Sequence, residues 1–221
     1  MDRYRKLANR LTETARSHGR SAEEIHLLAV SKRQSIDAIK RIAAYGQRRF
    51  GENYLQEAKS KIAALAPFKL EWHFIGKLQS NKTREIATLF DWVHSVDRIK
   101  IAQRLNDQRP ETATPLNICV EVNIDSELSK GGVTIDEVPS FIDGLAAFPR
   151  LRIRGLMAMP APETCFEQQR KSFRRLREIF SKIDRPAFDT LSMGTSNDFE
   201  AAVSEGATIV RIGTALFGPR N

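Results

Sequence analysis

The sequence alternates between short apolar runs and longer amphipathic stretches along its whole length. The apolar runs have the length of strands, and the stretches between them carry their apolar residues at helical spacing. This order predicts a parallel sheet with right-handed crossovers, and eight strands favour a closed (β/α)8 TIM barrel over an open doubly wound sheet. The predicted strands are 26–31, 48–51, 71–75, 91–95, 116–123, 151–157, 187–192 and 208–212, and the predicted helices between them are 35–45, 53–65, 80–89, 97–107, 134–147, 164–183 and 197–205.

The two ends of the sequence fit the same barrel. Only "TALFGPRN" follows the last predicted strand, which is too short for a full covering helix. An amphipathic helix is predicted at 2–17, with Leu7 and Leu11 on its apolar side. Strands one and eight are neighbours in a closed barrel, so this extra helix can cover the gap. The 221 residues contain no linker or internal repeat, and we expect one domain over 1–221.

Residues at the predicted helix ends give local support. Ser35 is a candidate N-cap of the first barrel helix. The motif Thr164-x-x-Glu167 reads as a capping box at the start of the longest helix. Ser196 or Asn197 is the expected cap of the last predicted helix.

Composition excludes several classes of protein. No apolar stretch is long enough to cross a bilayer, and the N-terminal residues lack the apolar region of a secretory signal. Cys119 and Cys165 are too few for a disulfide framework or a zinc site, so a reducing cytoplasm is expected. The net charge of +8 invites a nucleic-acid hypothesis, but the basic residues are scattered over helix faces without a nucleic-acid-binding motif. We expect no membrane and no specific nucleic-acid partner, only a modest preference for anions.

A lysine stands at the exit of the first predicted strand. Lys32 follows the apolar run 27–30 almost directly, and a helix signal begins soon after it. One interpretation is a solvated strand end whose amine reaches water. The other is a functional amine, because active groups of such barrels collect where the carboxyl ends of the strands converge.

Two other strand ends are typical of phosphate sites. In "SMGTSND" a glycine precedes Ser196, and in "RIGTALFG" Gly213 and Thr214 offer close backbone N–H groups and a hydroxyl. The alternative is that Gly194 and Gly213 only permit tight turns. A lysine facing a phosphate site across the mouth suggests a phosphorylated carbonyl compound, and pyridoxal 5′-phosphate (PLP) needs this pairing.

Arg211 is two residues before Gly213 and therefore on the same strand face. It could donate to the pyridine nitrogen of PLP, where its fixed charge would disfavour protonation and weaken the ring as an electron sink. The alternative is an ion pair with a strand-end carboxylate such as Glu121.

Six stretches together resemble the pyridoxal-phosphate homeostasis proteins over essentially the whole chain. They are "LLAVSK", "FGENYLQEA", "EWHFIGKLQSNK", "RGLMAMPAP", "LSMGTSNDFEAA" and "VRIGTALFG". The resemblance implies the fold of the alanine racemase N-terminal barrel domain and binding of PLP. Lys32 is then the implied Schiff-base lysine.

The same resemblance implies roles for other strand-end residues. Ser196, Gly213 and Thr214 are the implied phosphate ligands, and Arg211 is the implied partner of the pyridine nitrogen. Thr195 departs from the methionine that is usual before the serine, which puts the packing of this turn in doubt. The residues implied to line the ring are Asn53, His73, Ser192 and Met193; for His73 a purely structural role at a strand end is an equal alternative.

The leading hypothesis is a non-catalytic or weakly catalytic, monomeric protein that binds PLP, controls its free level and hands it to PLP-dependent apoenzymes. An amino-acid racemase is the alternative. It is disfavoured because only seven residues follow Thr214, leaving no second domain to supply a catalytic tyrosine, and the tyrosines are Tyr4, Tyr45 and Tyr54. An anion- or nucleic-acid-binding module is the third possibility. The segment 126–132 looks like a mobile loop, in which Lys130 could transiently accept cofactor.

Overall fold

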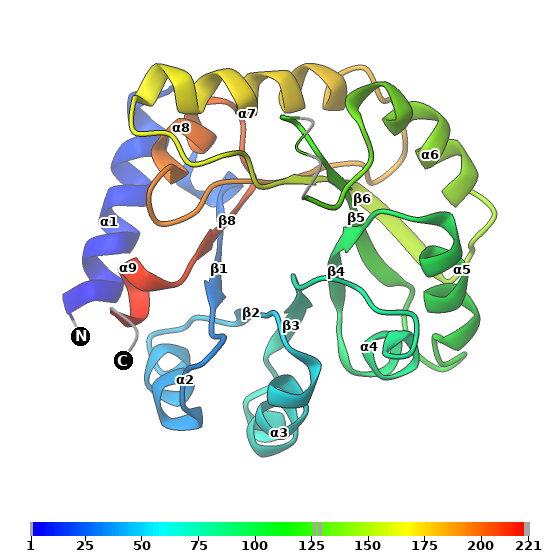
Figure 1. The fold of residues 1–221 in the computed structure, drawn as a ribbon. Helices are drawn as coiled ribbons and strands as arrows, with labels where there is room; N and C mark the ends of the chain where they lie inside the picture. Colours follow the sequence, from blue (N-terminus) through cyan, green and yellow to red (C-terminus); the bar gives the residue numbers. More distant parts are fainter. Residues whose placement is uncertain (1, 126, 128–129, 219–221) are drawn as a thin grey trace.

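A computed structural model describes residues 2–125, 127 and 130–218. In these residues eight parallel strands form one closed barrel in sequence order, and helices surround it (Figure 1). β1 pairs with both β2 and β8, so the sheet has no free edge. The predicted (β/α)8 barrel is confirmed. The strands are β1 (His26–Val30), β2 (Arg49–Glu52), β3 (Glu71–Phe74), β4 (Trp92–Val96), β5 (Leu116–Val122), β6 (Leu151–Ala158), β7 (Thr190–Ser192) and β8 (Ile209–Ile212).

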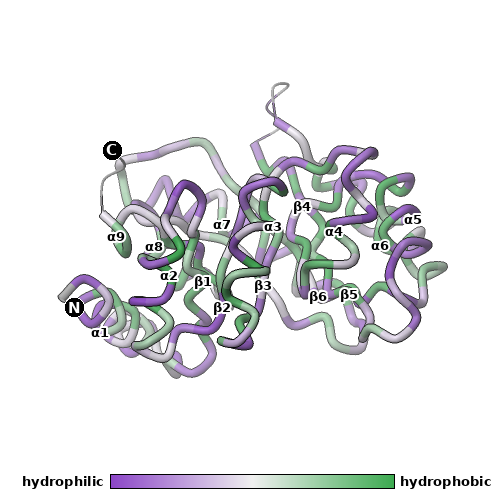
Figure 2. The backbone as a smooth tube through the Cα atoms, turned by 90° about the horizontal axis from the view of Figure 1, so that it is seen from below, coloured by the Kyte–Doolittle hydropathy of each residue, from purple (hydrophilic) through white to green (hydrophobic). Residues whose placement is uncertain are grey.

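The helices follow the predicted order, and Figure 2 shows hydrophilic and hydrophobic residues alternating along them, as expected for helices with one face on the barrel. Their inner faces and the outer faces of the strands form one large apolar core. The helices are α1 (Asp2–Ser17), α2 (Ile36–Ala43), α3 (Leu55–Leu65), α4 (Thr83–Leu89), α5 (Ile99–Gln108), α6 (Val138–Leu145), α7 (Phe166–Phe180), α8 (Phe199–Ser204) and α9 (Thr214–Phe217).

The extra helix α1 covers the side of the barrel where the chain ends meet. It packs against α8 and α9, and the two termini of the described chain lie close together (Figure 1). Leu7 and Leu11 are buried on its inner side. The predicted role of this helix is therefore confirmed: it occupies the place that the four-residue α9 is too short to fill.

The predicted ends of the elements are partly confirmed and partly wrong. The Ser35 cap is confirmed, since its hydroxyl accepts the Ala38 N–H at 3.2 Å. The capping box at Thr164 and Glu167 does not form, because α7 starts at Phe166 and its N-cap is Cys165. β7 begins at Thr190, three residues later than predicted, because a turn precedes it in which Phe188 N–H donates to the Arg185 carbonyl.

No helix within the described ranges is long and apolar enough to span a bilayer. Both cysteines are free thiols, Cys119 buried and Cys165 exposed. Across the same ranges no group of three or more His, Cys, Asp or Glu side chains is arranged to hold a metal ion.

Candidate functional site

A cavity of about 330 Å³ lies at the carboxyl ends of the strands. The residues that line it come from seven of the eight strand ends, from Val30 at the end of β1 to Thr214 after β8. Six of the nine residues predicted for the site are in its wall: Lys32, Asn53, Ser196, Arg211, Gly213 and Thr214. Residues up to 182 positions apart in sequence are thereby brought to one mouth of the barrel, as the fold requires.

The backbone on both sides of Lys32 is held in place. The Ser31 hydroxyl donates to Glu52 Oε1 at 2.6 Å, and Lys61 Nζ donates to the Ser31 carbonyl at 2.7 Å. The Arg33 N–H donates to Glu57, and Arg33 itself has a left-handed φ of 60°. Lys32 therefore leaves the strand at a turn that is fixed from β2 and α3.

Asn53 follows β2 and reaches the cavity from the neighbouring strand. A side chain at Gly76 would come within 2.0 Å of the Asn53 carbonyl oxygen, so the close approach of these two strand ends requires a glycine. Asn53 Oδ1 is buried and has no hydrogen-bond partner among the described residues. A buried acceptor of this kind is costly to leave unpaired, which indicates a missing donor.

The turns after β7 and β8 meet and form an N–H-rich wall. The Ser196 hydroxyl accepts the Ala215 N–H at 3.3 Å, which joins the two turns. In the described chain no hydrogen bond uses the backbone N–H of Ser196, Gly213 or Thr214 as its donor. These groups and the two hydroxyls can bind an anion without displacing a protein acceptor.

The turn before Ser196 depends on one glycine and one aspartate. Gly194 has a φ of +92°, and a Cβ there would lie 2.6 Å from Ala202 Cβ. Thr195 donates from its N–H and its hydroxyl to Asp198 Oδ1. The predicted cap at Ser196 or Asn197 is wrong, because this carboxylate closes the turn and delays α8 until after Asp198.

Arg211 lies in the floor of the cavity with 6% of its surface exposed. It donates from Nη1 to the Ser192 carbonyl and hydroxyl at 2.5 and 2.9 Å, and from Nη2 to the Ala158 carbonyl at 2.9 Å. These three bonds leave two of the five guanidinium N–H groups for a ligand. Arg211 does not form the alternative ion pair with Glu121. Its guanidinium donates instead to neutral oxygens of Ser192 and Ala158.

Three predicted site residues do not line the cavity. His73, Ser192 and Met193 each have no exposed surface. His73 and Ser192 lie in the barrel interior, where both belong to a hydrogen-bonded chain, and Met193 belongs to the apolar core. Strand residues point alternately inward and outward, so a strand-end motif contains positions that never reach the mouth.

Residues that the sequence did not single out complete the cavity. Ile75, Met157 and Met159 form apolar walls. Their position at strand ends was visible, but apolar side chains there look like ordinary core. Glu121, which the sequence offered only as an alternative partner of Arg211, is also in the wall. Burial, followed by the nearby charge of Asp97, raises the pKa of its carboxyl group.

A second cavity of about 240 Å³ adjoins the first and shares Asn53, Ile75, Glu121 and Met159 with it. Lys130 lines this second cavity, paired with Glu127 at 2.5 Å and donating to the Met159 carbonyl at 3.1 Å. Residues 126, 128 and 129 of the predicted loop lie outside the described chain.

The family model for the alanine racemase N-terminal domain matches residues 5–221. The pyridoxal phosphate homeostasis protein of Pseudomonas aeruginosa is 52% identical over 216 residues, covering 98% of this chain and 94% of that protein. The protein of the same name from Escherichia coli is 49% identical over 218 residues, covering 96% and 93%.

Among solved structures, PipY of Synechococcus elongatus with PLP bound superposes with a TM-score of 0.81 at 35% identity, covering 94% of this chain and 100% of that one. The matches in sequence and in fold agree, and they span the barrel together with its extra helix. The chain belongs to the alanine racemase N-terminal domain family and, within it, to the pyridoxal phosphate homeostasis proteins.

Proposed function

We propose that this protein binds pyridoxal 5′-phosphate in the cavity at the carboxyl end of the barrel, linked to Lys32, and that it keeps the intracellular level of PLP in balance. The observation that carries the proposal is the placement of the Lys32 amine and the N-H-rich turns at 196 and 213–214 in one cavity. The names of the relatives and the PLP-bound PipY structure support it.

The residues present fit the chemistry of this group. When bound, PLP supplies an electrophilic aldehyde and an aromatic ring that can accept electrons. The Lys32 amine adds to the aldehyde carbon, water leaves, and a C=N bond replaces the C=O bond. Ser196, Gly213 and Thr214 hold the phosphate through backbone N–H groups that donate to no acceptor within the described residues, together with the hydroxyls of Ser196 and Thr214.

Arg211 supports a carrier more than a catalyst. A guanidinium keeps its proton at all ordinary pH values, so a ring nitrogen that accepts from it stays unprotonated. An unprotonated ring is a weaker electron sink. None of the three tyrosines, all of them in the described chain, lines the cavity, whereas two-base racemisation needs an acid or base on each face of the substrate. The proposed role is therefore binding and hand-over, with PLP-dependent apoenzymes as recipients.

The proposal includes a monomer in the cytoplasm. The two free cysteines support a reducing compartment.

Borohydride reduction tests the linkage. Purified protein loaded with PLP should keep the reduced cofactor on one peptide, the one that contains Lys32. Lys32→Ala should lose this adduct and still fold, because the residue follows the strand and is not in the core. Lys77→Ala is the matched control, since Lys77 is a lysine that follows β3 at the same mouth of the barrel. An adduct that survives in Lys32→Ala would reject Lys32 as the site.

Turnover separates the carrier from the racemase. Incubation with either enantiomer of alanine should give no racemisation above that of free PLP. Saturable racemisation that disappears in Lys32→Ala would show that the protein is an enzyme after all.

A further inference from the structure

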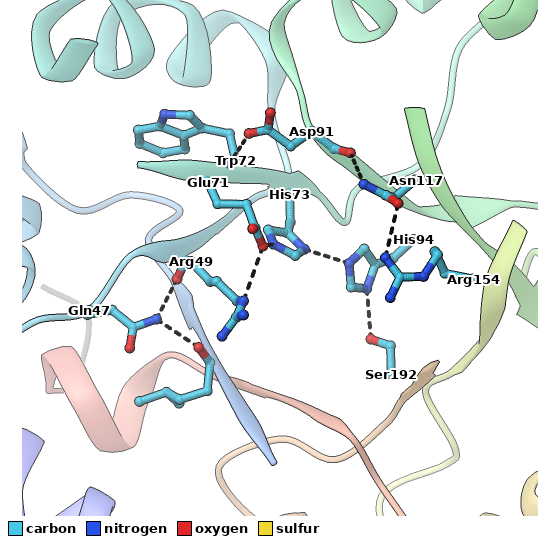
Figure 3. A network of polar contacts seen from close by, with 11 residues as sticks. Gln47, Arg49, Glu71, Trp72, His73, Asp91, His94, Asn117, Arg154 and Ser192 are labelled. Carbon is cyan, nitrogen blue, oxygen red and sulfur yellow. Dashed lines mark hydrogen bonds and ion pairs between the residues drawn. The ribbon is translucent and has the colours of Figure 1, made fainter. Parts of the chain in front are cut away.

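A chain of buried polar side chains crosses the barrel interior below the cavity (Figure 3). It begins at Glu71 on β3 and passes through His73 and His94 to Ser192 on β7. The successive distances are 2.7 Å from Glu71 Oε1 to His73 Nε2, 2.8 Å from His73 Nδ1 to His94 Nε2, and 2.8 Å from His94 Nδ1 to Ser192 Oγ. Arg211 Nη1 extends the chain by donating to Ser192 Oγ at 2.9 Å.

Hydrogen-bond chemistry allows only one direction along this chain when both histidines are neutral. A carboxylate can only accept, so His73 must donate from Nε2 and accept at Nδ1. His94 must then donate from Nε2 and accept at Nδ1, and the Ser192 hydroxyl must donate to it. The serine oxygen is left free to accept from Arg211. Every donor between the guanidinium and the carboxylate therefore points toward Glu71.

The surroundings keep the two histidines neutral. Neither His73 nor His94 has exposed surface, and burial lowers the pKa of His73 and, more strongly, that of His94. The positive charge of Arg211 lowers the pKa of His94 further. Trp92 stacks on His73 with ring centres 5.3 Å apart, and the Arg154 guanidinium lies 4.8 Å from the Trp92 ring centre.

The acidic end of the chain is at the opposite mouth of the barrel. Glu71 is about one-third exposed, with a side-chain exposure of 37%, and lines a cavity of about 520 Å³ together with His26, Arg49 and Arg154. Arg49 donates to Glu71 at 3.2 Å. Burial would raise the pKa of Glu71, but the hydrogen bond from His73 and the charge of Arg49 hold it below its ordinary value, so it remains a carboxylate.

We propose that Glu71, His73, His94 and Ser192 are positioning residues for Arg211, which they hold through a one-directional hydrogen-bonded chain so that its free N–H groups face the ligand. This inference rests on the proposed function, because the ligand group that Arg211 meets is the pyridine nitrogen of PLP. A carboxylate at the end makes each acceptor along the chain stronger, including the serine oxygen that binds Arg211. The charge of Glu71 at one mouth of the barrel thereby stabilises the contact between Arg211 and the ligand at the other mouth.

Nuclear magnetic resonance of the ligand-free protein tests the hydrogen-bonded chain itself. The protein has four histidines, so long-range ¹H–¹⁵N spectra of their rings can be assigned with single variants. We expect His73 and His94 at neutral pH to be neutral and to carry their proton on Nε2. A protonated ring, or a proton on Nδ1, in either residue would overturn the one-directional chain. This measurement does not involve PLP.

A pair of ligands tests the link to Arg211. PLP is compared with its analogue in which C–H replaces the ring nitrogen, and the ratio of their affinities isolates the contact at that nitrogen. Ser192→Ala, which removes the acceptor, should lower the ratio by about tenfold. Glu71→Gln keeps an oxygen acceptor but removes the charge, and should lower the ratio by about threefold. His26→Gln, in the same distant cavity but outside the chain, should leave the ratio unchanged.

General damage to the fold would weaken both ligands together and leave their ratio constant. An unchanged ratio in Ser192→Ala and Glu71→Gln, in protein that still forms the borohydride-reducible bond to Lys32, would overturn the positioning role and leave the proposed function intact. Wild-type protein that forms no bond to PLP would contradict both the positioning role and the proposed function.

Discussion

Glu121 lines both cavities at the barrel mouth, and the raised pKa of its carboxyl group has a consequence for stability. The folded state binds the proton of the Glu121 carboxyl group more tightly than the unfolded state does. The stability that this proton contributes is therefore fully present below the pKa of Glu121 in the unfolded state, and it is lost as the pH rises through the pKa in the folded state. Glu121→Gln should therefore gain free energy of unfolding relative to wild type between pH 4.5 and pH 8, by about 1.4 kcal/mol for each unit of upward shift. Urea denaturation across this range measures the difference, with the exposed Glu178→Gln as control. A difference independent of pH would contradict the prediction.

At the same scale, the sequence predicted which strand ends meet at the cavity better than it predicted which side chains line it. Lys32, Arg211 and the glycine turn at 213 were visible because cations and glycines are unusual at the ends of buried strands. Ser192 was predicted to line the ring, but it lies in the barrel interior with no exposed surface. His73 lies there too, in agreement with the structural role that was its equal alternative. Whether a strand-end side chain faces the mouth or the layer below depends on strand stagger, which the sequence of one strand does not contain.

Three elements are joined by a buried ion cluster below the turn that carries Lys32. Lys61 of α3 donates to Glu52 of β2 at 2.8 Å, to Glu57 at 2.6 Å and to the carbonyl of Ser31, directly after β1, at 2.7 Å. Lys61→Met should cost about 3–5 kcal/mol of unfolding free energy, because it leaves the fully buried Glu52 carboxylate without its cation. Chemical denaturation gives the value. Lys59→Met, on the same helix in a surface pair with Glu85, should cost less than about 1 kcal/mol.

A double variant shows whether the cost comes from the stranded charge. Adding Glu52→Gln to Lys61→Met should recover part of the loss, since a neutral amide is easier to bury than an unpaired carboxylate. A double variant as unstable as the sum of the two single variants would mean that the cluster is not coupled.

The order and the type of the elements could be predicted, whereas several of their ends could not. Apolar spacing along α7 is strong enough to place the helix, but Thr164 lies outside it and caps nothing. Capping boxes form instead at Thr134 and Glu137, before α6, and at Ser21 and Glu24, before β1. Caps depend on a single dihedral change at the chosen residue, so a motif with the right spacing can go unused.

For the whole molecule, strand–helix alternation was sufficient to predict a closed barrel, because every strand needs two neighbours and every helix a face to cover. The polar interior was not predicted. Glu71, His73 and His94 lie on two neighbouring strands, and their spacing in sequence gives no sign that they meet. Such a chain exists only once the barrel closes and brings Ser192 and Arg211 to the far end of the same line.

The net charge of the whole molecule offers a competing explanation for any affinity toward PLP, because a protein with a formal charge of +8 attracts anions in general. If the turns at Ser196 and Thr214 bind the phosphate, PLP should bind far more tightly than unphosphorylated pyridoxal, by several charge-assisted hydrogen bonds of about 1.5–3 kcal/mol each before competing costs. Ser196→Ala with Thr214→Val should reduce this preference by about tenfold or more without changing the net charge.

The control is Lys171→Ala with Lys182→Ala, which replaces two exposed lysines. It takes the charge from +8 to +6 (8 − 2 = 6) and should leave the preference for PLP over pyridoxal unchanged. Titration of both ligands at low and at moderate salt distinguishes the two explanations. Salt screens diffuse attraction strongly, whereas the affinity of a specific phosphate site falls less. Equal affinity for the two ligands, or a preference that only the lysine variant removes, would mean that the glycine turns bind no phosphate.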